Sequence, residues 1–237
     1  MSMRAGFPRL LLPEMLDTLV EDDPRAIHSR KDLRRINRIM GAAGILLQAL
    51  GSTPTAPRRI IEFGAGDGSL MLRLAQRLSS RWTDVHVVLL DRQNVVDQQT
   101  LNDFSRIGWR VEIVQADINE WAASGEARQF DIAIANLFIH HFEARQISRL
   151  FGALSECTDM FVACEPRRER LPLLASRLVG LIGANEVTRK DAVISVQAGF
   201  CDNELSSLWP SSTPDWNLTE RRAGLFSHLF TAQRRMV

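Results

Sequence analysis

The sequence contains no tyrosine, only three cysteines and no long uninterrupted hydrophobic run. The lack of tyrosine excludes any mechanism that needs a phenolic side chain. The cysteines, Cys157, Cys164 and Cys201, form no C-x-x-C pair, so they predict neither a disulfide framework nor a zinc site and fit a reducing cytoplasm. Near the N-terminus the apolar run 10–12 is cut by Pro13, which argues against a signal peptide and a transmembrane segment.

The sequence also has no marked excess of positive over negative charge, since its formal net charge is +1. A general nucleic-acid binder should be strongly basic, so we expect no nucleic-acid partner. The chain has 237 residues and is 45% hydrophobic, which fits one large α/β domain with room for a helical cap.

The most informative segment is 60–68, which reads I-I-E-F-G-A-G-D-G. A short apolar run passes into glycines spaced two apart, and an amphipathic stretch follows over 69–78. This pattern predicts a strand, a tight turn and a helix. Glycine is needed where the backbone bends sharply or touches a ligand, and the helix start offers free N–H groups toward it.

These residues resemble the first motif, E/D-x-G-x-G-x-G, of class I S-adenosylmethionine (SAM)-dependent methyltransferases. The rival is a nicotinamide or flavin site with the fingerprint G-x-G-x-x-G. Here the third glycine comes one residue early, and Glu62 stands before the first glycine. A carboxylate there would repel a pyrophosphate, whereas it would tolerate the cationic methionyl part of SAM.

Strands and helices alternate through the middle of the chain. Apolar strands are predicted at 59–63, 85–90, 111–115, 130–136 and 160–164, and helices at 69–78, 95–107 and 144–154. Unbroken apolar strands separated by helices indicate a parallel sheet covered on both faces. The tail, 216–222 and 227–233, predicts a closing antiparallel hairpin, typical of the seven-stranded Rossmann-like methyltransferase sheet. The predicted fold class is therefore α/β, mostly parallel, with this C-terminal hairpin and an N-terminal helical cap.

We expect residues 1–55 to form the helical cap, with helical apolar spacing over 30–50, and residues 56–237 to form the methyltransferase domain. Within it, 167–212 is a candidate substrate lid with helices near 171–182 and 203–208. An apolar stripe runs along it: Leu171, Leu174, Leu178, Leu181 and Ile182. Core packing is the expected role of this stripe. The alternative is a lid that faces a lipophilic substrate.

Ligands of open α/β sheets bind at the carboxyl ends of the strands. Asp91 ends the second strand, where its carboxylate can accept both ribose hydroxyls. Asp117 ends the third strand and can accept from the adenine amino group, with Ile118 packing on the ring. Asn136 ends the fourth, near the junction of methionyl group and acceptor. The resemblance implies SAM as cofactor, held by Glu62, Gly64, Ala65, Gly66, Asp91, Arg92, Asp117, Ile118 and Asn136.

The acceptor is indicated by the residues after the fourth strand. The N-P-P-Y type motif of DNA and glutamine N-methyltransferases is missing, because Leu137 and Phe138 stand where the prolines would be. This segment and Glu165-Pro166 resemble small-molecule enzymes of the ubiquinone-biosynthesis type. A narrower likeness, to bacterial enzymes of polyketide and alkylresorcinol tailoring, comes from 33–38, 191–196 and 199–200.

Two adjacent histidines, His140 and His141, fall at the mouth of the expected site. Histidine suits a general base near neutral pH, and we expect one of the two, with His141 favoured, to take a proton from an acceptor hydroxyl. The alternative is that the pair caps or packs the next helix. No set of side chains shows metal-ligand spacing, so no metal is predicted.

Arginines recur every four residues at Arg30, Arg34 and Arg38. They predict either a solvated basic helix face or a clamp for the carboxylate of SAM or of an anionic carrier.

The function expected from these residues is SAM-dependent methyl transfer, in secondary metabolism, to a phenolic or enolic oxygen of a polyketide-, alkylresorcinol- or quinol-like small molecule. That acceptor would be lipophilic or carrier-bound. The alternatives are a carbon- or nitrogen-methyltransferase acting on a small metabolite, and a non-catalytic interaction protein that kept the fold. The oligomeric state is not predicted.

Overall fold

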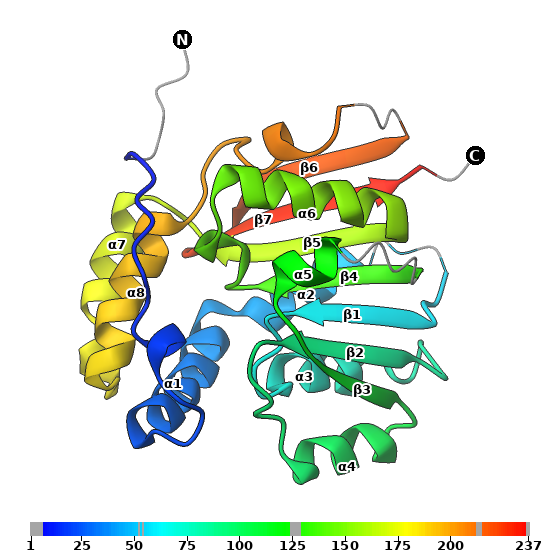
Figure 1. Cartoon of the computed structure of the whole chain (residues 1–237), viewed down its shortest axis with the longest axis horizontal. Coiled ribbons are helices and arrows are strands. Elements are labelled where there is room, and N and C mark those ends of the chain that lie inside the picture. Colours follow the sequence, from blue (N-terminus) through cyan, green and yellow to red (C-terminus); the bar gives the residue numbers. More distant parts are fainter. Residues whose placement is uncertain (1–6, 52, 54, 124–128, 212–214, 236–237) are drawn as a thin grey trace.

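A seven-stranded sheet forms the centre of the protein in the computed structural model (Figure 1). The structure describes all residues except 1–6, 52, 54, 124–128, 212–214 and 236–237. The strand order is β3-β2-β1-β4-β5-β7-β6, and only the pairings made by β7 are antiparallel. The strands are β1 (Arg59–Phe63), β2 (His86–Asp91), β3 (Arg110–Gln115), β4 (Phe130–Asn136), β5 (Thr158–Pro166), β6 (Trp216–Ala223) and β7 (Ser227–Arg234).

Helices cover both faces of the sheet and its carboxyl edge. In chain order they are η1 (Leu16–Thr18), α1 (Pro24–Met40), α2 (Ala42–Leu50), α3 (Ser69–Leu78), α4 (Gln98–Arg106), α5 (Ile118–Ala123), η2 (Ile139–His141), α6 (Ala144–Cys157), α7 (Arg170–Arg177), η3 (Val179–Ile182), α8 (Glu186–Ala198) and η4 (Ser206–Leu208). The fold class predicted from the sequence is confirmed. None of the helices in the described part of the chain has the length and hydrophobicity needed to cross a bilayer.

The core lies on both sides of the sheet because neighbouring residues of a strand point to opposite faces. Ile60 packs in the cluster that contains α2 and α3, whereas Ile61 packs in the cluster that contains α6. Both side chains are fully buried. The strands therefore read as continuous apolar runs, which is why their positions could be predicted from the sequence.

The predicted elements match most closely where the pattern is local. β1, α3 and β4 have the predicted bounds. The residues with helical spacing over 30–50 are helical but belong to two helices, because Gly41 adopts φ 71° and separates α1 from α2. Helix α1 also begins earlier, at Pro24, where Asp23 caps it by accepting from the backbone N–H of Arg25 at 2.8 Å. Helix α8 was not predicted.

Helices from the N-terminal segment 1–55 and from the insertion 167–212 form one cap beside the carboxyl edge of the sheet (Figure 1). The Thr188 hydroxyl on α8 donates to Ser29 on α1 at 2.9 Å, and the backbone N–H of Asn185 donates to Asp32 at 2.8 Å. Helix α7 packs on α8 in turn. Helix α2 instead packs in the core of the sheet. The leader and the insertion therefore meet in space, so that α1, α7, η3 and α8 act as a single cover.

The apolar stripe of the insertion does not pack in the core. The five side chains predicted there are between 39% and 83% exposed. The reason is that α7 packs on α8 through a different face, on which Pro172 and Ser176 are buried. The expectation of core packing is wrong: Leu171 and Leu174 are exposed on α7, whereas Leu178, Leu181 and Ile182 lie at the lining of a cavity.

Candidate functional site

A cavity of about 1260 Å³ lies between the carboxyl ends of the strands and the cap. It is lined by every cofactor residue and both histidines predicted from the sequence: Glu62, Gly64, Ala65, Gly66, Asp91, Arg92, Asp117, Ile118, Asn136, His140 and His141. The structure thus brings together residues that are far apart in the chain. They meet because parallel strands end at one edge of the sheet.

The glycine turn after β1 needs glycine for two different reasons. Gly64 has φ 65°, and a Cβ on it would lie 2.3 Å from Cδ2 of Phe138, so no larger residue fits. Gly66 has φ 53°, and a Cβ on it would meet nothing within 4 Å. Because Gly66 lines the cavity, this open space beside the backbone is available to a bound molecule.

Asp91 fixes this turn from the end of β2. Its Oδ2 accepts from the backbone N–H of Gly66 at 2.9 Å, and its Oδ1 accepts from the backbone N–H of Gln93 at 3.0 Å. A carboxylate has about four acceptor sites, so two further hydrogen bonds, such as those from a ribose diol, remain open to it. Asp91 therefore retains acceptor capacity beside the cavity, and its contact with a ribose remains a prediction.

Two buried acceptors in the cavity have no hydrogen-bond partner among the described residues: Oε2 of Glu62 and Oδ1 of Asn136. Burial, followed by the charges of Asp67 and Asp91, raises the pKa of Glu62 well above its usual value. An unsatisfied buried acceptor is costly, and a cationic donor removes the cost. The ammonium group of SAM is such a donor. On these observations the residues present fit SAM.

The other predicted cofactor residues also contact the protein itself. Oδ1 of Asp117 accepts from the backbone N–H of Asn119 at 2.7 Å, which holds the start of α5. Ile118 is buried. Arg92 forms an ion pair with Asp17 of the N-terminal segment at 3.3 Å.

Two arginines of α1 reach the loops that frame the cavity. Arg34 forms an ion pair with Asp67 of the glycine turn, and Nη2 of Arg30 donates to Oε1 of Gln93 at 2.7 Å. Arg38 remains exposed. These two contacts hold α1 against the predicted cofactor loops. Arg30 and Arg34 therefore bind other parts of the chain and are not merely solvated.

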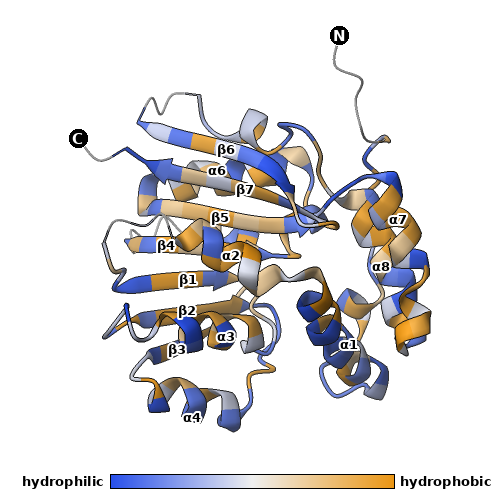
Figure 2. Cartoon of the chain, turned by 180° about the vertical axis from the view of Figure 1, so that it is seen from behind, coloured by the Kyte–Doolittle hydropathy of each residue, from blue (hydrophilic) through white to orange (hydrophobic). Residues whose placement is uncertain are grey.

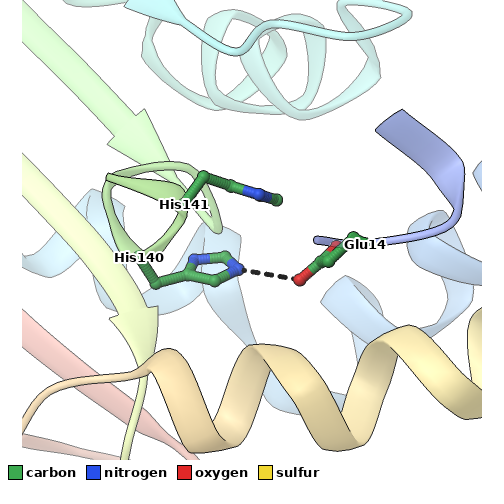
Figure 3. A group of neighbouring side chains, drawn as sticks. All are labelled: Glu14, His140 and His141. Carbon is green, nitrogen blue, oxygen red and sulfur yellow. Dashed lines mark ion pairs between the residues drawn. The ribbon is translucent and has the colours of Figure 1, made fainter. Parts of the chain in front are cut away.

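His140 is buried between two carboxylates. Its Nδ1 lies 2.7 Å from Oε2 of Glu165. On the other side of the ring, Nε2 lies 3.4 Å from Oε1 of Glu14, the ion pair drawn in Figure 3. Burial alone would lower the pKa of His140, but the hydrogen bonds and charges of Glu14 and Glu165 outweigh it and raise this pKa to about 9. His140 therefore carries a proton at neutral pH.

Glu165 organises the turn that carries the histidines. Its Oε1 accepts from the backbone N–H groups of Phe138 at 3.1 Å and Ile139 at 2.9 Å, while Oε2 holds His140. The carboxylate is fully buried at the end of β5. It therefore acts as a support for η2.

His141 has a different environment. Its side chain is 24% exposed, lines the cavity, and places Nδ1 3.2 Å from Oδ2 of Asp17. A carboxylate on Nδ1 fixes the tautomer that leaves Nε2 as the acceptor nitrogen. Of the two histidines, His141 is the one that a ligand in the cavity can reach, because its side chain is partly exposed whereas that of His140 is 2% exposed.

Sequence reasoning missed Glu14 and Asp17, which come from the N-terminal segment. No spacing or motif ties these acids to histidines near the middle of the chain. The ligand atoms of Glu14, His140 and His141 lie within 4.8 Å of one another (Figure 3). A metal ion could bridge them only after His140 loses its proton, and the absence of a metal remains a prediction.

The buried His140 predicts a particular pH dependence of stability. The pKa of His140 is about 9 in the folded state and 6.5 in its usual range. The stabilisation from its protonated form is therefore complete below pH 6.5 and is lost as the pH rises through about 9. We expect the thermal unfolding midpoint to fall across this range, and to fall from a lower pH in Glu14→Gln, which weakens the hold on the proton. The exposed Glu156→Gln is the matched control. Identical pH profiles for wild type and Glu14→Gln would contradict this assignment.

Comparison with known proteins gives one family match. The model of a family described as "Methyltransferase domain" matches residues 60–159. The tRNA1(Val) (adenine(37)-N6)-methyltransferase of Klebsiella pneumoniae subsp. pneumoniae is 33% identical over 99 residues, which cover 41% of this chain and 38% of that protein. The chain therefore matches less than half the length of this curated relative.

Solved structures match over most of the chain. The plantazolicin methyltransferase BpumL in complex with SAH has a TM-score of 0.63 at 12% identity, and the match covers 90% of this chain and 92% of that one. The pyocyanin biosynthetic protein PhzM has a TM-score of 0.57 at 19% identity, over 93% of this chain and 62% of that one. At these identities the likeness is one of fold.

Proposed function

We propose that this chain, a class I SAM-dependent methyltransferase, methylates a phenolic or enolic oxygen of a lipophilic small molecule. Bound SAM supplies an activated methyl group. The observation that carries the proposal is the cavity itself, in which the glycine turn, a carboxylate-oriented histidine and an apolar wall face one space.

The residues that would hold the cofactor are those at the carboxyl ends of β1 to β4. Gly66 allows close approach, Asp91 accepts hydroxyl donors, and Glu62 with Asn136 supplies acceptors for the ammonium group. Arg34 closes α1 over the turn through Asp67. Holding both reactants in one closed site supplies much of the rate enhancement in such a displacement.

His141 is the general base in this proposal. Asp17 holds its Nδ1, so that Nε2 can take the hydroxyl proton of the acceptor as the oxygen becomes nucleophilic. His140, protonated between Glu14 and Glu165, positions the turn and is not the base. In this proposal the two histidines therefore have different roles.

The apolar wall supports a lipophilic acceptor. It is built from α1 and from the insertion, and comprises Leu33, Ile36, Ile39, Met40, Leu178, Val179, Leu181 and Ile182. Burial of each methylene contributes about 0.8 kcal/mol, or roughly fourfold in affinity. A hydrocarbon chain on the acceptor would use this wall.

The second candidate is methylation of an RNA base, and the named activity of the Klebsiella relative favours it. Against it stand the net charge of +1 and the presence of Leu137 and Phe138 in place of the prolines of the N-P-P-Y type motif. Carbon- or nitrogen-methylation of a small metabolite uses the same cofactor site and remains a further alternative.

Acceptor profiling with radiolabelled SAM tests the proposal. We expect label to enter alkylphenols and alkylresorcinols, with KM falling at least tenfold from a methyl to a long alkyl substituent, and no label to enter unmodified tRNA. Replacing Met40 of the wall with serine should reduce the chain-length effect, whereas Leu218→Ser, on β6 away from the wall, should not. Label in tRNA and none in phenols would favour the second candidate.

A further inference from the structure

The mouth of the cavity has an apolar and exposed rim. Leu178, Leu181 and Ile182 from the insertion and Ile39 from α1 line the cavity and are exposed to solvent, Leu181 to 83%. Leu171 and Leu174 extend this surface along α7. Figure 2 shows hydrophobic residues along α7, at the side of the molecule away from the sheet. Exposed apolar residues gathered in one patch mark an interaction surface.

Cationic side chains flank this rim. Residues 170–182 contain no Asp or Glu, and Arg170 and Arg177 are exposed on α7. Arg35 of α1 donates to the carbonyl oxygen of Ile182, and the side chain of Arg189 lies beside Gly180. Apolar side chains bordered by arginines match the interface of an anionic bilayer, where the apolar part enters the headgroup boundary and the cations meet lipid phosphates.

We propose that residues 170–182, together with Ile39, dock on an anionic lipid surface and turn the mouth of the cavity toward the lipid. The continuity of the rim with the apolar wall favours this occupant over a protein. A lipophilic molecule could then pass from the bilayer into the cavity without crossing water. Lipid docking goes beyond the proposed function, because the binding of this surface to a bilayer does not depend on methyl transfer.

Co-sedimentation of the full chain with vesicles tests the docking. We expect binding to vesicles of phosphatidylcholine mixed with phosphatidylglycerol, and at least tenfold weaker binding of a Leu171→Glu/Leu174→Glu variant, whose two positions are exposed and do not line the cavity. Leu218→Glu introduces the same charge at an exposed position on β6 and should bind like the wild type. A second variant, Arg170→Glu/Arg177→Glu, should lose binding to the anionic vesicles at least tenfold.

Two further measurements distinguish the outcomes. Binding of S-adenosylhomocysteine and the thermal midpoint should be unchanged in all variants, which shows that the fold and the cofactor site are intact. Wild-type protein that stays in the supernatant, or a leucine variant that still sediments, would overturn the docking proposal. The docking proposal would also be overturned if light scattering showed a wild-type dimer that does not bind vesicles, together with a monomeric leucine variant. None of these results would contradict the proposed methyltransferase activity, which acceptor profiling tests separately.

Discussion

Replacing His141 with alanine is expected to lower turnover at least 100-fold while the affinity for S-adenosylhomocysteine stays the same. A positioned general base contributes about 10²–10⁴-fold to rate. His141 is the histidine whose Nδ1 is held by Asp17 and whose ring borders the cavity. The effect should appear in kcat, because the base acts on the acceptor hydroxyl and not on the cofactor. Steady-state kinetics with an alkylphenol and calorimetry with S-adenosylhomocysteine check the two parts.

Three variants make this assignment specific. Asp17→Asn keeps the shape but weakens the hold on Nδ1, and should lower kcat by less than His141→Ala does. His28→Ala, at an exposed position on α1, should leave kcat unchanged. Unchanged turnover in His141→Ala and in the double variant with His140→Ala would remove the general-base role.

Asp91→Ala is expected to weaken binding of SAM and S-adenosylhomocysteine at least 100-fold. Each hydrogen bond to a charged group contributes about 1.5–3 kcal/mol, and the carboxylate has acceptor capacity for a ribose diol. The same truncation releases the backbone N–H groups of Gly66 and Gln93, so the glycine turn also loses its support. Calorimetry with each adenosyl compound, and with NADH as a specificity control, measures the loss.

Asp159→Ala is the matched control for this variant. Asp159 lies near the start of β5, at the opposite end of the sheet, and its side chain is 65% exposed. We expect its affinity for both compounds to equal that of the wild type. If Asp91→Ala also bound like the wild type, the second strand end would not be part of the cofactor site, and an enzyme role for the cavity would need another basis.

Much of the site could be predicted because it depends on local sequence. The glycines at 64 and 66 follow a strand directly, and Asp91, Asp117 and Asn136 each lie at or just after a strand end. Parallel pairing then brings strand ends to one edge whatever the loops do. The apolar stripe of the insertion was misjudged because helical spacing shows that a face is apolar but not what it packs against.

The sequence by itself determined the alternation of strands and helices, the tight turn after β1 and the order in which polar residues reach the strand ends, because each depends on a few neighbouring residues. Only the tertiary structure decided that Glu14 and Asp17 lie against His140 and His141, that Arg34 meets Asp67, and that the leader and the insertion form one cap. Those contacts join segments distant in the chain. They depend on how whole elements pack and how loops close, and no local pattern records either.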